Sequence, residues 1–214
     1  MFVESGKKMD VRVYGTKNRI IDGLFQCMKE KPFNSVLNRD IISKAEISSR
    51  TFYRHYSDKN QVIREFEDKF ADGLTEAFAQ DRKALYKLGH NPSKADVHKI
   101  ADTAFHHTMI FCDEYKKEGK LLLSPNGDIR FSWLIRRTSE KEFFIRAKYI
   151  YGNHTIPKNN PHHTMVQKIY VGSIVSAIET WLTYSDEVPQ QDARKILADL
   201  QVLSPMEVMN KVGI

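Results

Sequence analysis

Apolar residues recur at helical spacing along most of the chain, and this periodicity constrains the fold more than any other feature. In the first such segment, Ile20, Ile21, Leu24, Phe25 and Met28 share one face of a helix. Similar stripes follow at residues 62–78, 97–112, 166–182 and 193–203. Because no segment shows the sustained alternation of a half-buried strand, the 214-residue chain is predicted to be all-α.

Capping residues and prolines indicate where the helices begin and end. Thr16 is a favourable N-cap for the first helix, and Pro32 ends that helix. Two short helices are expected next, at residues 38–45 and 48–56, and the Ser57-Asp58 pair caps a long fourth helix. The sequence therefore predicts a flexible arm at residues 1–15, a three-helix helix-turn-helix domain at 16–58 and a larger helical domain at 59–214.

The larger domain has a less even pattern. Residues 97–112 read as one helix, Ser124–Gly127 as a turn, and residues 129–151 as a less regular segment. Two further helices are expected at residues 162–185 and after Pro189.

The positive charge is concentrated at the N-terminus. Residues 1–60 carry 12 basic and 7 acidic side chains, whereas the rest of the chain carries 21 and 20. A nucleic-acid-binding domain joined to a neutral partner domain shows this distribution.

Other classes of protein are disfavoured by what the sequence lacks. No apolar run approaches the roughly 20 residues of a membrane span, and the N-terminus has no signal-peptide core. The two distant cysteines, Cys27 and Cys112, suit a reducing cytoplasm. The chain contains none of the common catalytic or nucleotide-binding motifs. We therefore expect a cytoplasmic protein that is not an enzyme and needs no cofactor or metal.

The segment from Leu37 to Lys59 reads as two short helices joined by a tight turn. In the second helix, Phe52 and Tyr56 lie four residues apart and are expected to face inward. Arg50 and Arg54 share the opposite face, and arginine and hydroxyl side chains are suited to contact base edges and phosphates. The predicted DNA-binding residues are Arg39, Ser48, Ser49, Arg50, Thr51, Tyr53, Arg54, His55 and Lys59.

The run Ala-Glu-Ile-Ser-Ser-Arg-Thr-Phe-Tyr-Arg-His-Tyr-Ser-Asp-Lys at residues 45–59 resembles the signature of TetR-family regulators. That signature reads alanine, glycine, valine, serine, two variable residues, threonine, leucine, tyrosine, a variable residue, histidine and phenylalanine, with lysine three residues later. The Arg-Thr-Phe-Tyr form is similar to a subgroup common in Gram-positive bacteria. Glu46 replaces the turn glycine, and Leu37 and Asn38 replace a threonine cap and a valine. Asn38 is expected to cap the second helix instead.

The resemblance implies a homodimeric transcriptional regulator that binds double-stranded DNA at a palindromic operator. In this family such a protein is most often a repressor released by a small-molecule effector. The alternative is a protein-interaction module of similar sequence that acts as a coactivator through a partner protein.

The resemblance also implies that C-terminal helices pair across a dimer. Small residues at 172, 173, 176 and 177 would allow two helices to approach closely across the dimer, with close packing within one chain as the alternative. The predicted interface residues are Tyr170, Gly172, Ser173, Ser176, Ala177, Trp181, Leu197 and Leu200.

Aromatic and polar residues in the middle of the larger domain are candidates for an effector pocket, with an ordinary aromatic core as the alternative. The predicted pocket residues are Phe105, His106, Met109, Trp133, Arg136, Tyr149 and Trp181. His98, Asp102 and His106 have metal-ligand spacing on one predicted helix, but a polar helix face is the preferred interpretation.

Overall fold

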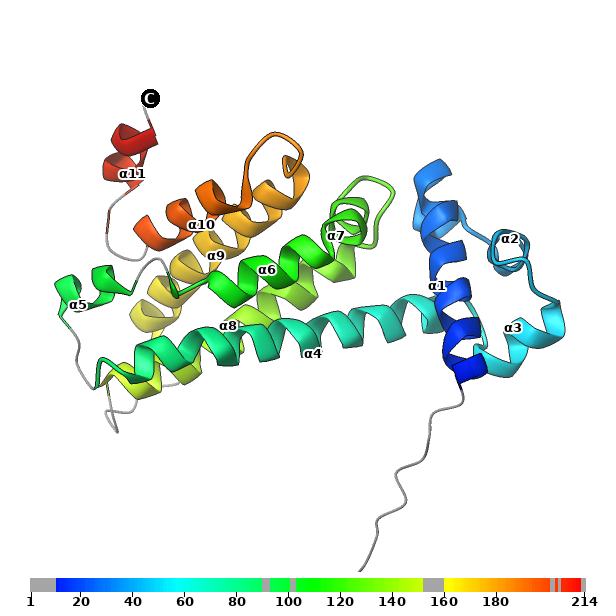
Figure 1. Cartoon of the computed structure of the whole chain (residues 1–214), viewed down its shortest axis with the longest axis horizontal. Helices are drawn as coiled ribbons and strands as arrows, with labels where there is room; N and C mark the ends of the chain where they lie inside the picture. The colour runs from blue at the N-terminus through cyan, green and yellow to red at the C-terminus, as the bar shows by residue number, and fades with distance from the viewer. Residues whose placement is uncertain are drawn as a thin grey trace, which may run out of the picture. The chain divides into compact units, whose positions relative to one another are not determined.

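The structure, a computed structural model, describes residues 11–89, 93–100, 103–151, 160–200, 203 and 205–212. Its regular elements are all helical, as predicted from the apolar periodicity (Figure 1). In chain order they are α1 (Val11–Glu30), the 3₁₀ helix η1 (Phe33–Ser35), α2 (Asn38–Lys44), α3 (Ser49–His55), α4 (Lys59–Tyr86), α5 (Lys94–Lys99), α6 (His106–Glu114), α7 (Lys116–Leu122), α8 (Ile129–Tyr151), α9 (Pro161–Thr183), α10 (Gln190–Asp199) and α11 (Pro205–Val212).

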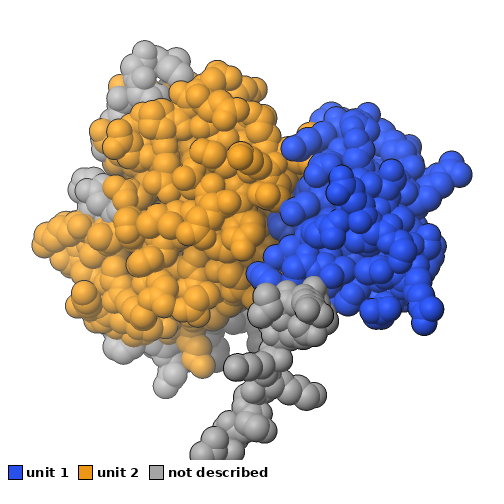
Figure 2. Space-filling view, turned by 45° about the vertical axis from the view of Figure 1, so that its right-hand side comes forward, with its two compact units in different colours: residues 1–68, 125–127 blue, residues 69–124, 128–214 orange. Residues whose placement is uncertain are grey.

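The chain forms two compact units, coloured separately in Figure 2. Unit 1 contains residues 1–68 and 125–127, and unit 2 contains residues 69–124 and 128–214. Helix α4 begins in unit 1 and continues into unit 2. The predicted boundary between residues 58 and 59 stays a prediction.

Unit 1 has its own apolar core. The inward faces of α1, α2, α3 and the start of α4, together with the residue after η1, supply its fully buried side chains, which are Ile20, Leu24, Met28, Val36, Ile41, Phe52, Val62 and Ile63. The turn Pro125–Gly127 packs in the same unit, where Asn126 Nδ2 donates a hydrogen bond to the Met28 carbonyl (3.0 Å) and the Asn126 carbonyl accepts one from the Phe33 amide (2.9 Å). This core fixes how the two short helices α2 and α3 lie against α1.

The core of unit 2 lies among α6, α9 and α10, where α10 contacts both α6 and α9, while α8 packs on α9. It comprises Ala104, Phe105, Met109, Cys112, Ile174, Ile178, Trp181, Leu182, Ala193 and Leu197. Both cysteines are buried free thiols.

Two predictions about the helices were wrong. Helix α1 begins at Val11, so Thr16 lies inside the helix rather than at its cap. Residues 97–112 do not form one helix, because α5 ends at Lys99 and α6 begins at His106. Residues 129–151, whose apolar pattern is less regular, form the continuous helix α8. The helix of residues 162–185 and the helix after Pro189 are confirmed as α9 and α10.

Candidate nucleic-acid interface

The turn between α2 and α3 depends on one residue in a left-handed conformation. Glu46 has φ 52°, the region that favours glycine, in the position where the sequence departs from the usual turn residue. Arg19 of α1 stabilises this turn by donating hydrogen bonds through Nη2 to the carbonyls of Ala45 (2.7 Å) and Glu46 (2.8 Å). The sequence analysis did not identify Arg19, because its partners are backbone atoms.

Helices α1 and α2 approach each other closely at Gly23. A Cβ atom at this position would lie 3.0 Å from the Ala45 amide nitrogen and 3.1 Å from the Ile41 carbonyl oxygen. Both distances are shorter than normal contacts, so glycine permits the observed packing of α2 on α1.

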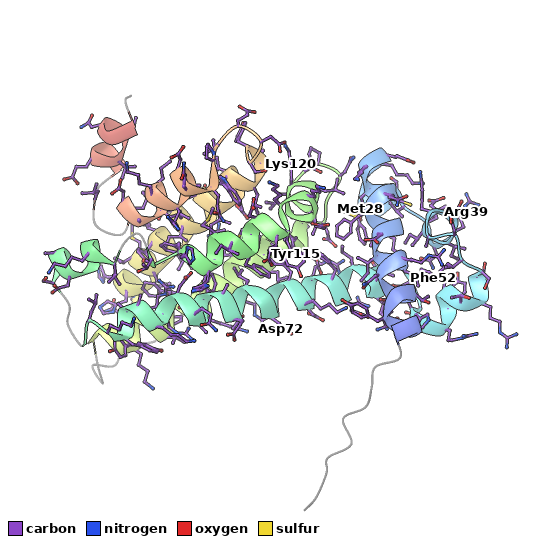
Figure 3. All side chains as sticks on the ribbon, in the orientation of Figure 1. Met28, Arg39, Phe52, Asp72, Tyr115 and Lys120 are labelled. Carbon is purple, nitrogen blue, oxygen red and sulfur yellow. The ribbon has the colours of Figure 1, made fainter. Side chains whose placement is uncertain are left out.

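Helix α3 is capped and anchored as predicted. Ser48 is its N-cap, and its hydroxyl accepts a hydrogen bond from the Thr51 amide (3.1 Å). Phe52 and Tyr56 are buried, with ring centroids 6.2 Å apart, and Figure 3 marks Phe52 on α3. Two buried rings on one side of a seven-residue helix hold its other side toward solvent.

The outer side of α3 presents most of the predicted DNA-binding residues. Ser49, Arg50, Tyr53 and Arg54 are exposed, and Arg39 is exposed on α2 (Figure 3). In the part of the chain that the structure describes, Arg50 and Arg54 form no side-chain hydrogen bond or ion pair. Their guanidinium donors are therefore available to another molecule. The other predicted residues lie nearby in sequence: Ser48 at the cap, and Thr51 and His55 half-buried in α3.

Lys59 has a structural role that the sequence analysis did not anticipate. Its ammonium donates to the carbonyls of Phe33 (2.7 Å), Asn34 (2.8 Å) and Val36 (2.7 Å), and it lies 4.9 Å from the centre of the Phe33 ring. These three bonds use all the donors of the ammonium group. Burial lowers the pKa of Lys59, and the nearby carboxylates of Asp40 and Asp58 oppose that shift.

Asn38 does not cap α2, which corrects the prediction. Leu37 holds the N-cap position, and its amide donates to Asp40 Oδ2 (2.8 Å). The Asn38 carbonyl oxygen Oδ1 instead accepts a hydrogen bond from the Lys59 amide at the start of α4 (2.9 Å). Asp58 caps α4 as predicted, through its bond to the Gln61 amide (2.9 Å).

Most of the residues predicted to form an effector pocket lie apart from the cavity found in unit 2. Phe105 lines that cavity, but Met109 and Trp181 are packed in the core, and Trp133 is 70% exposed on α8. Arg194 Nη1 lies 2.9 Å from His106 Nδ1, and the Tyr149 hydroxyl donates to the Tyr86 carbonyl (2.7 Å). Arg136 lies beside Gly172 of α9.

The suggested metal stripe does not lie on one helix, because α5 and α6 are separate. Asp102 and the side chain of His98 lie outside the described residues. Among the side chains that the structure does place, no group of three or more His, Cys, Asp or Glu is arranged to hold a metal ion.

The predicted dimer residues divide into two groups. Ser173 and Ser176 are exposed on α9. Trp181 and Leu197 are buried in the core of unit 2, and the indole N–H of Trp181 donates to the Val188 carbonyl (3.0 Å). Tyr170 and Gly172 pack toward α8 of the same chain, through Phe143 and Arg136. Ala177 and Leu200 are half-buried.

Comparisons with known proteins agree with this geometry. Residues 20–66 match the family model described as bacterial regulatory proteins, tetR family. A TetR transcriptional regulator from Streptococcus agalactiae 2603V superposes with a TM-score of 0.57 at 16% identity, covering 91% of this chain and 97% of that one. A putative TetR-family transcriptional regulator from Syntrophomonas wolfei str. Goettingen superposes with a TM-score of 0.56 at 14% identity, covering 93% of this chain and 96% of that one. No curated protein matches the sequence.

None of the helices placed by the structure is long and apolar enough to cross a membrane. The family match covers α2, α3 and their supporting core, and the structural matches extend the same fold over the rest of the chain. Residues 20–66 therefore match the tetR-family domain, and the chain has the overall fold of the TetR-family regulators on which it superposes.

Proposed function

We propose that the protein is a homodimeric repressor that binds a palindromic operator through α3 and releases it when a small molecule binds unit 2. The observation that carries the proposal is the two-sided character of α3. Phe52 and Tyr56 fix one side in the core, and the unpaired Arg50 and Arg54 occupy the other.

The size and polarity of α3 suit the major groove. A helix of two turns fits the groove, and its N-terminal residues reach furthest toward the bases. Arg50 lies in the first turn, where its guanidinium can donate two hydrogen bonds to a guanine. Arg54 and Tyr53 lie in the second turn, where donors to phosphate oxygens orient the helix without reading sequence.

Lys59 enters this proposal differently from the other predicted residues. Because its ammonium is bonded to three carbonyls, we propose that it orders the segment before α2. Its contribution to DNA binding then comes through the position of α2 rather than through a direct contact of its ammonium with phosphate.

An exposed apolar surface on α8 and α9 supports the proposed dimer. Ile129 and Trp133 on α8 are 80% and 70% exposed, and Met165, Val166 and Ile169 on α9 are each more than 60% exposed. Ser173 and Ser176 continue the Ile169 face at helical spacing, where small side chains permit close helix approach. The α8 residues lie near the other end of α9, because Ser132 bonds to Glu179 whereas Phe143 contacts Tyr170, so this strip joins two exposed apolar groups. Exposed apolar groups of this kind mark interaction sites. We therefore propose α8 and α9, rather than α9 and α10, as the dimer surface.

A charge introduced into this surface tests the dimer. Ile169→Arg should halve the mass measured by sedimentation equilibrium without changing the helix content, whereas Gln191→Arg, at an exposed position on α10 outside the proposed surface, should leave the mass unchanged. A monomeric wild-type chain, or a dimeric Ile169→Arg variant, would contradict the proposed surface.

Fluorescence anisotropy with labelled DNA from upstream of the protein's own gene tests DNA recognition. The variant Arg50→Ala/Arg54→Ala should lose at least about tenfold in affinity, since each good base contact is worth about 1–3 kcal/mol. The matched control is Lys83→Ala/Lys87→Ala, which removes two exposed basic residues at the same spacing near the end of α4. Equal affinity of the two double variants would show that α3 does not bind the DNA.

A further inference from the structure

A cavity in unit 2 combines an apolar wall with charged residues on one side. It has about 320 Å³ of empty space, including its open mouth. Its apolar wall consists of Phe78, Phe105, Phe143, Tyr170, Val171 and Ile174. Its polar side consists of Ser139, Glu142 and Arg146, all from α8.

The polar side is organised around one carboxylate. Glu142 accepts a hydrogen bond from Arg146 Nε through Oε1 (2.7 Å) and one from Arg82 Nη1 through Oε2. The Arg146 guanidinium also lies 5.5 Å from the centre of the Phe105 ring. Both guanidinium groups are largely buried, so their positions are fixed by this packing.

The hydrogen bonds of this cluster leave donors unused. Arg82 Nε, Arg146 Nη2 and the Ser139 hydroxyl are buried and have no partner among the described residues. Ser139 is only 7% exposed. Each oxygen of Glu142 already accepts a hydrogen bond. Buried polar groups are normally satisfied, so the cluster is complementary to a ligand that supplies acceptors.

The unused donors belong to two cationic groups and one hydroxyl group. Arg82 and Arg146 both bond to the single carboxylate of Glu142. The carboxylate of Asp81 interacts electrostatically with Arg146, but it takes its hydrogen bonds from the amides of His107 (2.8 Å) and Thr108 (3.0 Å) and the Thr108 hydroxyl (2.6 Å) at the start of α6. The guanidinium groups therefore keep N–H donors that suit an anionic acceptor.

From these observations we infer that the cavity binds a small organic carboxylate, with its carboxylate on Arg146 and Ser139 and its apolar body against Phe78, Phe143 and Ile174. The claim that such a carboxylate is the effector rests on the proposed function. The claim that the cavity binds a carboxylate does not depend on it.

Isothermal titration of the full-length chain, in the absence of DNA, tests the site. The probes are 3-phenylpropanoate and octanoate, with 3-phenylpropanamide and 3-phenylpropylamine as uncharged and cationic analogues. At least one carboxylate should bind, and both analogues should bind at least about tenfold more weakly, because hydrogen bonds to a charged group are worth about 1.5–3 kcal/mol.

Variants on α8 identify the residues responsible. Arg146→Met should weaken carboxylate binding by about tenfold or more. Ser139→Ala should weaken it several-fold, and because its hydroxyl has no partner in the described structure, this variant should fold like the wild type. Arg137→Met, which replaces an exposed arginine of the same helix, is the matched control and should bind normally.

Three results would overturn the inference: no binding of either carboxylate, equal binding of the amide or amine, or normal binding by Ser139→Ala and Arg146→Met together. Carboxylate binding that leaves DNA affinity unchanged would confirm the site but contradict effector release. Carboxylate binding by a chain that recognises no DNA would likewise separate the two proposals.

Discussion

Asn38, the first residue of α2, accepts the backbone amide hydrogen of Lys59, the first residue of α4, over a distance of 2.9 Å. The first amides of a helix have no partner within that helix, so a side chain from another element can satisfy one of them. The side chain of Lys59 in turn bonds to carbonyls just before α2. The start of α4 and the start of α2 thus fix each other in unit 1.

This reciprocal arrangement predicts that Asn38→Ala destabilises the protein by about 1 kcal/mol, the usual loss for a helix cap. Urea unfolding followed by circular dichroism measures the effect. Arg39→Ala, at the exposed neighbouring position, should unfold like the wild type and serves as the control. Equal midpoints for Asn38→Ala and the control would show that the bond contributes nothing.

The two glycines of α1 should respond in opposite ways to alanine. Gly23→Ala should destabilise by about 1–3 kcal/mol, because its methyl group overlaps Ala45 and forces α1 and α2 apart. At Gly15, no atom of another described element lies within 4 Å of the new methyl group. Gly15→Ala should therefore stabilise the protein by up to about 1 kcal/mol, since alanine favours a helix. Thermal unfolding of both variants checks this, and a Gly23→Ala variant as stable as Gly15→Ala would contradict the close approach.

Glu46 is strained in the turn, so glycine at this position should improve stability. Glu46→Gly should raise the unfolding free energy by up to about 1 kcal/mol, because glycine adopts a positive φ without steric cost. Glu46→Ala keeps the strain while removing the charge, and should bring no gain. If alanine stabilised the protein as much as glycine, the charge rather than the backbone conformation would be the cause.

Asp40 links the stability of unit 1 to pH. Hydrogen bonds from Lys31 and the Leu37 amide lower the pKa of Asp40 below its ordinary value of 3.8. The folded state therefore holds the proton of Asp40 less tightly than the unfolded state, and the resulting stability is present above pH 3.8 and lost as pH falls through the folded pKa.

The stability advantage of the wild type over Asp40→Asn should accordingly be largest near neutral pH and decrease on acidification below about pH 4. Chemical unfolding across pH 3 to 7 measures this difference, with Asp22→Asn, at an exposed aspartate of α1, as the control for charge loss. A difference that stayed constant across this range would contradict the assigned hydrogen bonds.

The sequence predicts α3 and its two faces well because each requirement there is local. The cap at Ser48, the inward pair Phe52 and Tyr56, and the outward pair Arg50 and Arg54 are all separated by helical spacings within one short segment. The roles of Arg19, Asn38 and Lys59 could not be predicted in the same way. Each bonds to backbone atoms that are distant in sequence and leave no side-chain signature.

Helix α8 shows why the rest of unit 2 was harder to predict. Its buried positions include the polar residues Thr138, Ser139 and Glu142, while Trp133 and Ile129 are exposed. Because polar residues are buried and large apolar residues are exposed on α8, its sequence lacks the apolar periodicity of an amphipathic helix and reads as less regular. The same arrangement produces the polar side of the cavity and the apolar surface proposed for the dimer, so both features were missed together.

Selection of binding sites from a pool of random double-stranded DNA by the full-length chain tests the central claim most directly. A dimer that reads DNA through α3 should enrich an inverted repeat whose half-sites are about 10 base pairs apart, or a multiple of that spacing. The Arg50→Ala/Arg54→Ala variant should enrich no such repeat. Failure of the wild-type chain to enrich any sequence, or enrichment of the same repeat by the double variant, would contradict the account.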